Sequence, residues 1–204
     1  MKIYALNSSV FDDNDALFAE KINTLSVYRQ NKIYSCKYFQ DRKRSLAAGV
    51  LTDIALSRFG LKEKDMYYSE NENGKPYFVG YDDIFFSLSH SGDWAIAAFS
   101  DCEIGCDIQQ IKDINLNIAK RYFISEEYEY IIASKDKIDS FFSLWSRKES
   151  YIKAIGTGLS TSLKSFNVFE IADWQFKEYD DIAGYKIAVC SKEYPTDNII
   201  VCEI

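Results

Sequence analysis

Residues 141–158 constrain the fold more than any other part of this sequence. Their apolar side chains recur at helical spacing and two glycines end the pattern, so we predict a helix. On that helix Trp145, Glu149 and Lys153 stand four residues apart and share one stripe. A Glu–Lys pair at this spacing is usually solvated, but the tryptophan indicates partial burial. Because burying charge is costly without a partner, we look for chemistry on this stripe.

Length and composition indicate a globular chain, either one large domain or two halves of about 100 residues. The 204 residues carry a net charge of -7, which argues against nucleic acid as a partner. We find neither a signal-peptide core nor an apolar run of the ~18 residues that a membrane helix needs, so we expect no membrane association. Five cysteines without a CxxC pair fit free thiols in a reducing cytoplasm.

Patterning along the rest of the chain predicts alternating strands and helices. The expected strands are residues 2–8, 84–89, 94–99, 103–109, 166–169, 174–176, 185–190 and 199–202. The expected helices are an interrupted one at 14–37, one from Asp41 to Gly60, and two more at 118–123 and 126–133, the last with Ser125 as its cap. Asn73-Gly74 predicts a hairpin turn, and Pro76 places the following strand at an edge.

The strand at 103–109 carries an acidic residue where acids are rare. Its period of two puts Gly105, Asp107 and Gln109 on one face and three apolar residues on the other. A strand aspartate needs a partner, and a metal is one candidate. With a single histidine in the chain, that metal would be a hard cation on oxygen ligands rather than zinc.

Basic residues cluster where an anion could bind. Residues 42–44 oppose the macrodipole of their helix, which is tolerable if an anion sits at its N-terminus, although a solvated turn offset by Asp41 is equally open. Lys75 in the hairpin turn, and Ser89 with His90 at a strand end, are further candidates, with ordinary structural roles as the alternative.

These side chains could converge on one site. Asp107 and Glu149 could supply carboxylates to Mg²⁺, with Lys153 one helical turn away. Phosphate oxygens could be bound by three more side chains: Arg44, Lys75 and His90. Such a set suits a nucleotide-like pyrophosphate attacked at phosphorus. A faint internal repeat, residues 41–45 with 146–150 and 95–100 with 186–191, suggests two copies of one helix-plus-sheet unit.

Five motifs follow one another along the chain: Gly74-Lys-Pro76, Phe86-Ser-Leu-Ser-His-Ser-Gly92, Ile104-Gly-Cys-Asp-Ile108, Ala119-Lys-Arg-Tyr-Phe123, and Trp145-Ser-Arg-Lys-Glu-Ser-Tyr-Ile-Lys153 with Gly156-Thr-Gly-Leu159. In order and spacing they resemble the 4'-phosphopantetheinyl transferases of the surfactin-synthetase-activating type. The resemblance implies an α+β fold of two similar halves, 1–101 and 102–204, related by a pseudo-twofold with the site between them. Two halves complete their own site, so we expect a monomer.

The resemblance implies a Mg²⁺-dependent enzyme (Mn²⁺ possible), a holo-[carrier protein] synthase. It would move the phosphopantetheine arm of coenzyme A onto a serine of an acyl or peptidyl carrier protein and release adenosine 3',5'-bisphosphate. Asp107 and Glu149 would hold the metal, Glu149 would help deprotonate the serine, and Lys153 would neutralise the leaving phosphate. Gln109 stands where many relatives have an acid, so we expect weaker metal affinity.

The remaining residues implied by the resemblance would hold the coenzyme A phosphates: Arg44, Lys75, Ser89, His90, Lys148, Arg29 and Lys32. A nucleotide pyrophosphatase with the same metal site, and a catalytically inactive coenzyme A-binding module, are the rival interpretations. Because carrier domains are usually acidic, we also expect an exposed basic or apolar patch near the cleft.

Overall fold

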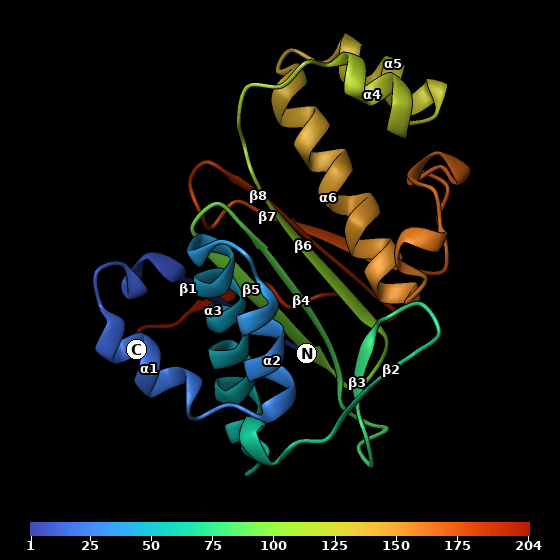
Figure 1. Cartoon of the computed structure of the whole chain (residues 1–204). Coiled ribbons are helices and arrows are strands. Elements are labelled where there is room, and N and C mark those ends of the chain that lie inside the picture. Colours follow the sequence, from blue (N-terminus) through green and yellow to red (C-terminus); the bar gives the residue numbers. More distant parts are fainter.

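The structure, a computed structural model, describes residues 1–204, the side chain of Leu159 excepted, as a mixed α+β fold (Figure 1). The strands are β1 (Lys2–Asn7), β2 (Tyr68–Glu70), β3 (Pro76–Phe78), β4 (Phe85–Ser91), β5 (Trp94–Ser100), β6 (Ile104–Gln110), β7 (Gln175–Tyr179), β8 (Tyr185–Ser191) and β9 (Ile199–Val201). The α-helices are α1 (Asp15–Ile22), α2 (Val27–Ser35), α3 (Phe39–Ser57), α4 (Asn117–Tyr122), α5 (Ser125–Ala133) and α6 (Lys137–Ile155).

Two antiparallel units are built in the same order. In the first, β1, α3, β4 and β5 follow one another and the strands lie in the order β4-β5-β1. In the second, β6, α6, β7 and β8 follow one another and the strands lie in the order β7-β8-β6. Both helices have 19 residues. This recurrence is what two similar halves predict, although β9 leaves its own half and pairs in parallel with β1.

The two sheets pack face to face, and a long helix covers the outer face of each (Figure 1). The core between the sheets is made of apolar residues from both units: Ile3, Ala5, Ile96, Ala98, Ile104, Cys106, Ile108, Ile187 and Val189. On β6 the face opposite these residues is also buried, because α6 lies against it. Asp107 therefore sits on a strand that is covered on both sides.

A row of serines joins the two sheets along the seam between β4 and β6. Alternate side chains of β4 point to β6, and their hydroxyl oxygens accept hydrogen bonds from its backbone N–H groups. The pairs are Ser87 with Cys106 at 3.0 Å, Ser89 with Ile108 at 3.3 Å and Ser91 with Gln110 at 3.0 Å. The seam is thus closed by side chains rather than by a backbone ladder, which fixes the register of β6 relative to β4.

Most predicted elements are present, with four differences. The strand predicted at 166–169 is wrong, since no strand forms there, and Val168 instead donates its N–H to Glu127. The strand predicted to end at residue 89 continues to Ser91, so the turn is shorter. Ser125 is the first residue of α5 and not its cap. Residues 146–150 lie within α6, not at a helix start. No helix among the described residues is both long and apolar enough to cross a membrane.

Candidate active site

Helix α6 and strand β6 meet at a glycine, and that contact positions the acidic residues. A Cβ added to Gly105 would lie 1.9 Å from the Ser150 carbonyl oxygen and 2.4 Å from the Ala154 nitrogen. Only glycine permits this approach of helix to strand. The approach brings Glu149 and Lys153 of α6 beside Asp107 of β6.

Asp107 is buried and fully hydrogen-bonded. Its Oδ1 accepts from the Lys153 ammonium at 2.6 Å and from the Ser89 hydroxyl at 2.8 Å, and its Oδ2 accepts from the Gln109 amide at 2.9 Å. The Lys153 ammonium also donates to Ser89 at 2.9 Å. Three donors, one of them a cation, compensate the burial of this carboxyl group. The cluster takes its residues from β4, β6 and α6, and so spans both halves of the fold.

Glu149 lies in the same cavity but is held differently. No hydrogen bond or ion pair joins its carboxylate to another of the described residues. Burial raises its pKa, and the Asp107 charge raises it further while Lys153 lowers it. Burial opposes the charge on Lys153 too, but Asp107, Cys106 and Glu149 together outweigh that effect, so the pKa of the ammonium lies above its ordinary value. Glu149 is thus a half-buried carboxylate with its coordinating oxygens available.

The cavity around this cluster has a volume of about 400 Å³ and a basic wall. Arg29 is only 6% exposed, its Nη2 donates to the Ser45 carbonyl at 2.8 Å, and its buried Nε has no partner among the described residues. Lys32 lines the same wall and pairs with Glu70 at 3.0 Å. Because Arg29 and Lys32 both line the cavity, its wall carries positive charge that suits an anion.

His90 lines this cavity, whereas Arg44 lies near His90 but does not line it. His90 lines the cavity from the end of β4. Desolvation lowers the pKa of His90, and the nearby charges of Arg44 and Lys153 lower it further. Arg44 donates to the Gly92 carbonyl at 2.9 Å and pairs with Asp41. The structure therefore brings Ser89, His90 and the basic wall together with the carboxylates.

Two of the sequence-predicted phosphate ligands have other partners. The prediction for Lys148 is wrong: its side chain is fully buried, and its ammonium donates to both Glu127 oxygens at 2.5 Å and to the Phe166 carbonyl at 2.7 Å. Lys75 donates to the carbonyls of Ile104 and Ala154 at 3.2 and 2.9 Å. Its ammonium is thus occupied by backbone rather than aimed at the 400 Å³ cavity.

Sequence reasoning missed the supporting residues of the site. Ser87 and Ser91 hold β6 in register, and their signal was present as serines at every second position of β4. Glu127, the partner of Lys148, is fully buried, although an acid in the first turn of a helix is usually exposed. Asn71, which donates to the Gly156 carbonyl at 2.8 Å, looks like an ordinary turn residue in the sequence.

Two further cavities adjoin the site and meet it at Lys153. One, of about 290 Å³, lies between the hairpin turn 73–76 and α6 and also contains Arg29 and Lys32. The other, of about 500 Å³, is lined mainly by apolar and hydroxyl side chains and contains Trp145 and Glu149. Lys153 lines all three cavities, which we refer to together as the cleft.

The donor set of the cleft fits a hard divalent cation. Asp107 and Glu149 face one cavity and Gln109 adds an amide, which leaves positions for water and phosphate oxygens, as Mg²⁺ prefers. Among the described residues, the one cluster of three potential metal ligands within mutual reach is Asp101, Cys102 and Glu193. That surface group does not line the cleft.

Comparison with known proteins agrees with this site. Residues 103–200 match the 4'-phosphopantetheinyl transferase superfamily. The chain is 37% identical over 223 aligned residues to 4'-phosphopantetheinyl transferase Sfp of Bacillus subtilis (strain 168), covering 98% of this chain and 97% of that protein. It is 34% identical to the Bacillus subtilis transferase ffp, covering 97% and 96%. It is 28% identical to the transferase gsp of Aneurinibacillus migulanus, covering 98% and 83%.

A two-sheet α+β fold that places two carboxylates and a basic wall around one cavity fits an enzyme that transfers a phosphoryl group. The chain belongs to the 4'-phosphopantetheinyl transferase superfamily, and it is an enzyme of that class.

Proposed function

We propose that the cleft transfers the 4'-phosphopantetheine arm of coenzyme A to a serine of an acyl or peptidyl carrier protein, with release of adenosine 3',5'-bisphosphate. The observation that carries this proposal is the Asp107–Lys153–Ser89 cluster beside Glu149, with a basic wall on one side and a less polar cavity on the other. The 290 Å³ cavity suits the nucleotide, and the 500 Å³ cavity suits the arm and the incoming serine.

Each residue has a role that follows from its position. Arg29 and Lys32 line both the nucleotide cavity and the central one, so they would bind phosphate of the nucleotide. Ser89, His90 and Lys153 would contact the diphosphate, and Lys153 would neutralise the charge that develops on the leaving phosphate. Glu149 borders both the central and the apolar cavity, so it can accept the proton of the serine hydroxyl, directly or through a water.

Asp107 and Glu149, with Gln109, would hold Mg²⁺ or Mn²⁺. When bound, the cation supplies charge neutralisation at the diphosphate. Lys153 donates to Oδ1 of Asp107 and Gln109 donates to Oδ2, so these two side chains hold the carboxylate in place beside Glu149.

The partner surface adjoins the apolar cavity. Lys120 and Arg121 are exposed on α4, beside Tyr122, which lines that cavity. We propose that this basic edge meets an acidic carrier domain, that the enzyme acts as a monomer, and that it works in the cytoplasm, where its five free thiols suit the reducing environment. Reversing the charge, as in Arg121→Glu, should raise KM for the carrier with little change in kcat.

The test is mass spectrometry of a panel of apo carrier proteins incubated with the enzyme, coenzyme A and Mg²⁺. We expect a carrier to gain one phosphopantetheine group, and a carrier whose acceptor serine is replaced by alanine to gain none. Glu149→Gln should reduce turnover by at least about 100-fold. Release of adenosine 3',5'-bisphosphate from coenzyme A without any carrier would instead indicate hydrolysis. Full activity of Glu149→Gln would refute the assigned base.

A further inference from the structure

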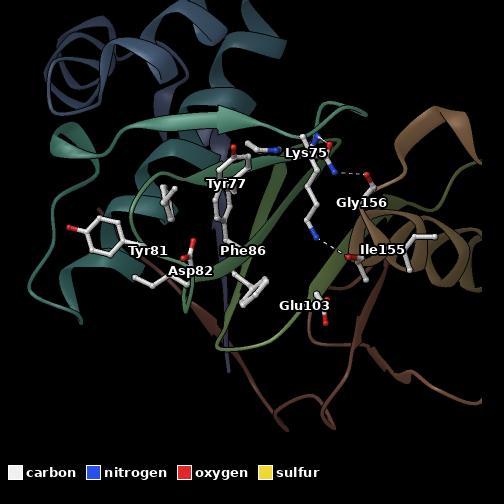
Figure 2. A pocket seen from close by; sticks show the side chains of 14 residues that line it. Lys75, Tyr77, Tyr81, Asp82, Phe86, Glu103, Ile155 and Gly156 are labelled. Carbon is white, nitrogen blue, oxygen red and sulfur yellow. Dashed lines mark hydrogen bonds between the residues drawn. The ribbon is translucent and has the colours of Figure 1, made fainter.

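Lys75 connects three parts of the fold through one ammonium group. Figure 2 shows Lys75 reaching from the hairpin of the first unit toward the end of α6. Its ammonium donates to the carbonyl of Ile104, the first residue of β6, and to the carbonyl of Ala154, near the end of α6. Ile104 lies three residues before Asp107, and Ala154 directly follows Lys153. The two elements that carry the charged cluster are therefore tied to each other by a side chain from the other half.

Asn71 makes a second connection from the same turn. Its amide nitrogen donates to the Gly156 carbonyl at 2.8 Å, while its oxygen accepts the N–H groups of Asn73 at 3.0 Å and Lys75 at 2.8 Å. The side chain thus holds the turn in shape and attaches it to the end of α6. Gly156 is left-handed, with φ of 70°, and a Cβ there would lie 3.0 Å from Asn71.

The turn satisfies groups that a helix leaves unpaired. The last carbonyls of α6 have no partner within the helix, and a cation or an amide donor at this end is favourable both as a cap and against the helix dipole. Burial lowers the pKa of Lys75 to about 8, so the contact is made at the cost of desolvating the ammonium. A buried cation that caps another element is a specific structural connection rather than an ordinary turn lysine.

We propose that the turn 71–75 is a latch in which Lys75 and Asn71 are positioning residues: they hold the end of α6 on β6 and so set the geometry of Glu149 and Lys153 relative to Asp107. The inference rests on the proposed function, in which these three residues surround the reacting phosphate. The same turn lines the 290 Å³ cavity, so the latch also connects the nucleotide cavity to the catalytic helix.

The experiment measures kcat and KM for Asn71→Ala and Lys75→Met, with Lys64→Met, at an exposed position, as the control. Each full-length variant is assayed with a carrier protein and with coenzyme A that carries or lacks its 3'-phosphate. Each latch variant should lower kcat by on the order of 10- to 100-fold and raise KM for coenzyme A by less than about threefold, because misplacing reacting groups costs turnover rather than binding. Lys75→Arg, which keeps the donors, should recover part of the loss. The preference for the 3'-phosphate should not change.

Hydrogen–deuterium exchange gives a second readout that does not depend on activity. In both variants the amides of residues 152–156 should exchange faster than in the wild type, whereas the exchange rates in α3 should not change. Thermal unfolding checks that the variants are folded. Wild-type kcat in Asn71→Ala, or a Lys75→Met variant that loses only its preference for the 3'-phosphate, would overturn the latch. If Glu149→Gln keeps full activity, the proposed function fails, while the exchange result still decides whether the latch holds α6.

Discussion

The buried pair of Lys148 and Glu127 offers a quantitative test of how α6 is held. Both side chains are fully buried, and the ammonium makes two 2.5 Å contacts with the carboxylate. It also lies 4.4 Å from the centre of the Phe166 ring. Glu127 has two further donors, the N–H groups of Val168 at 2.9 Å and Ile124 at 3.3 Å. The pair thus joins α5, α6 and the segment near residue 166.

Lys148→Met removes the counter-charge and two of four donors but keeps the length of the side chain. An uncompensated buried charge costs about 3–5 kcal/mol, and the lost contact with the Phe166 ring adds about 1 kcal/mol. With an m-value of about 2 kcal/mol/M, the urea midpoint should fall by roughly 2–3 M.

The assay is urea unfolding followed by tryptophan fluorescence, since Trp145 lies on α6. The control is the double variant Glu127→Gln/Lys148→Met, in which no buried charge remains. It should recover more than half of the loss. A single variant that loses less than about 1 kcal/mol, or a double variant no more stable than the single one, would refute the reasoning.

Three further results are expected. Gln109→Glu should shift the Mg²⁺ dependence of activity to lower concentration, because the new carboxylate adds charge beside Asp107, and an unchanged dependence would count against the assigned metal ligands. Ser87→Ala leaves the buried N–H of Cys106 without its acceptor and should cost about 1–3 kcal/mol in denaturant unfolding, whereas the exposed Ser57→Ala should cost almost nothing. In the unfolded chain Lys75 keeps its proton to about pH 10, whereas in the folded protein its pKa is about 8. Folding therefore favours the neutral amine, and stability rises with pH between these two values. Between about pH 7.5 and 10, the free energy of unfolding of the wild type should increase by about 2 kcal/mol relative to that of Lys75→Met. A constant difference over that range would contradict the burial of the ammonium.

The sequence is sufficient to predict which charged residues of β6 and α6 lie close together, but not how the side chains next to them are oriented. Glu149 and Lys153 follow helical periodicity, and a strand aspartate beside a glycine identifies a close contact. Lys148 is adjacent to Glu149 in the sequence, yet consecutive side chains of an α-helix point about 100° apart around its axis. That rotation turns the lysine away from the cleft and towards Glu127, which no local pattern reveals.

The other differences arise from tertiary contacts. The segment at 166–169 alternates aromatic and branched residues like a strand, but its backbone is used to satisfy the buried pair. The two partners of Lys75 could not be located from the sequence, because backbone carbonyls leave no trace in the identity of the residues that carry them. Contacts made to backbone atoms are therefore the ones that sequence reasoning cannot locate.

The parallel pairing of β9 with β1 has a consequence for biosynthesis. Until residues 199–201 leave the ribosome, β1 has an open hydrogen-bonding edge in a sheet that is otherwise complete. Contacts between segments that are as far apart in the sequence as β1 and β9 form slowly, because closing the loop between them costs conformational entropy. The nascent first half would thus be open to β-strand addition by other chains, and release of the last strand would remove that hazard.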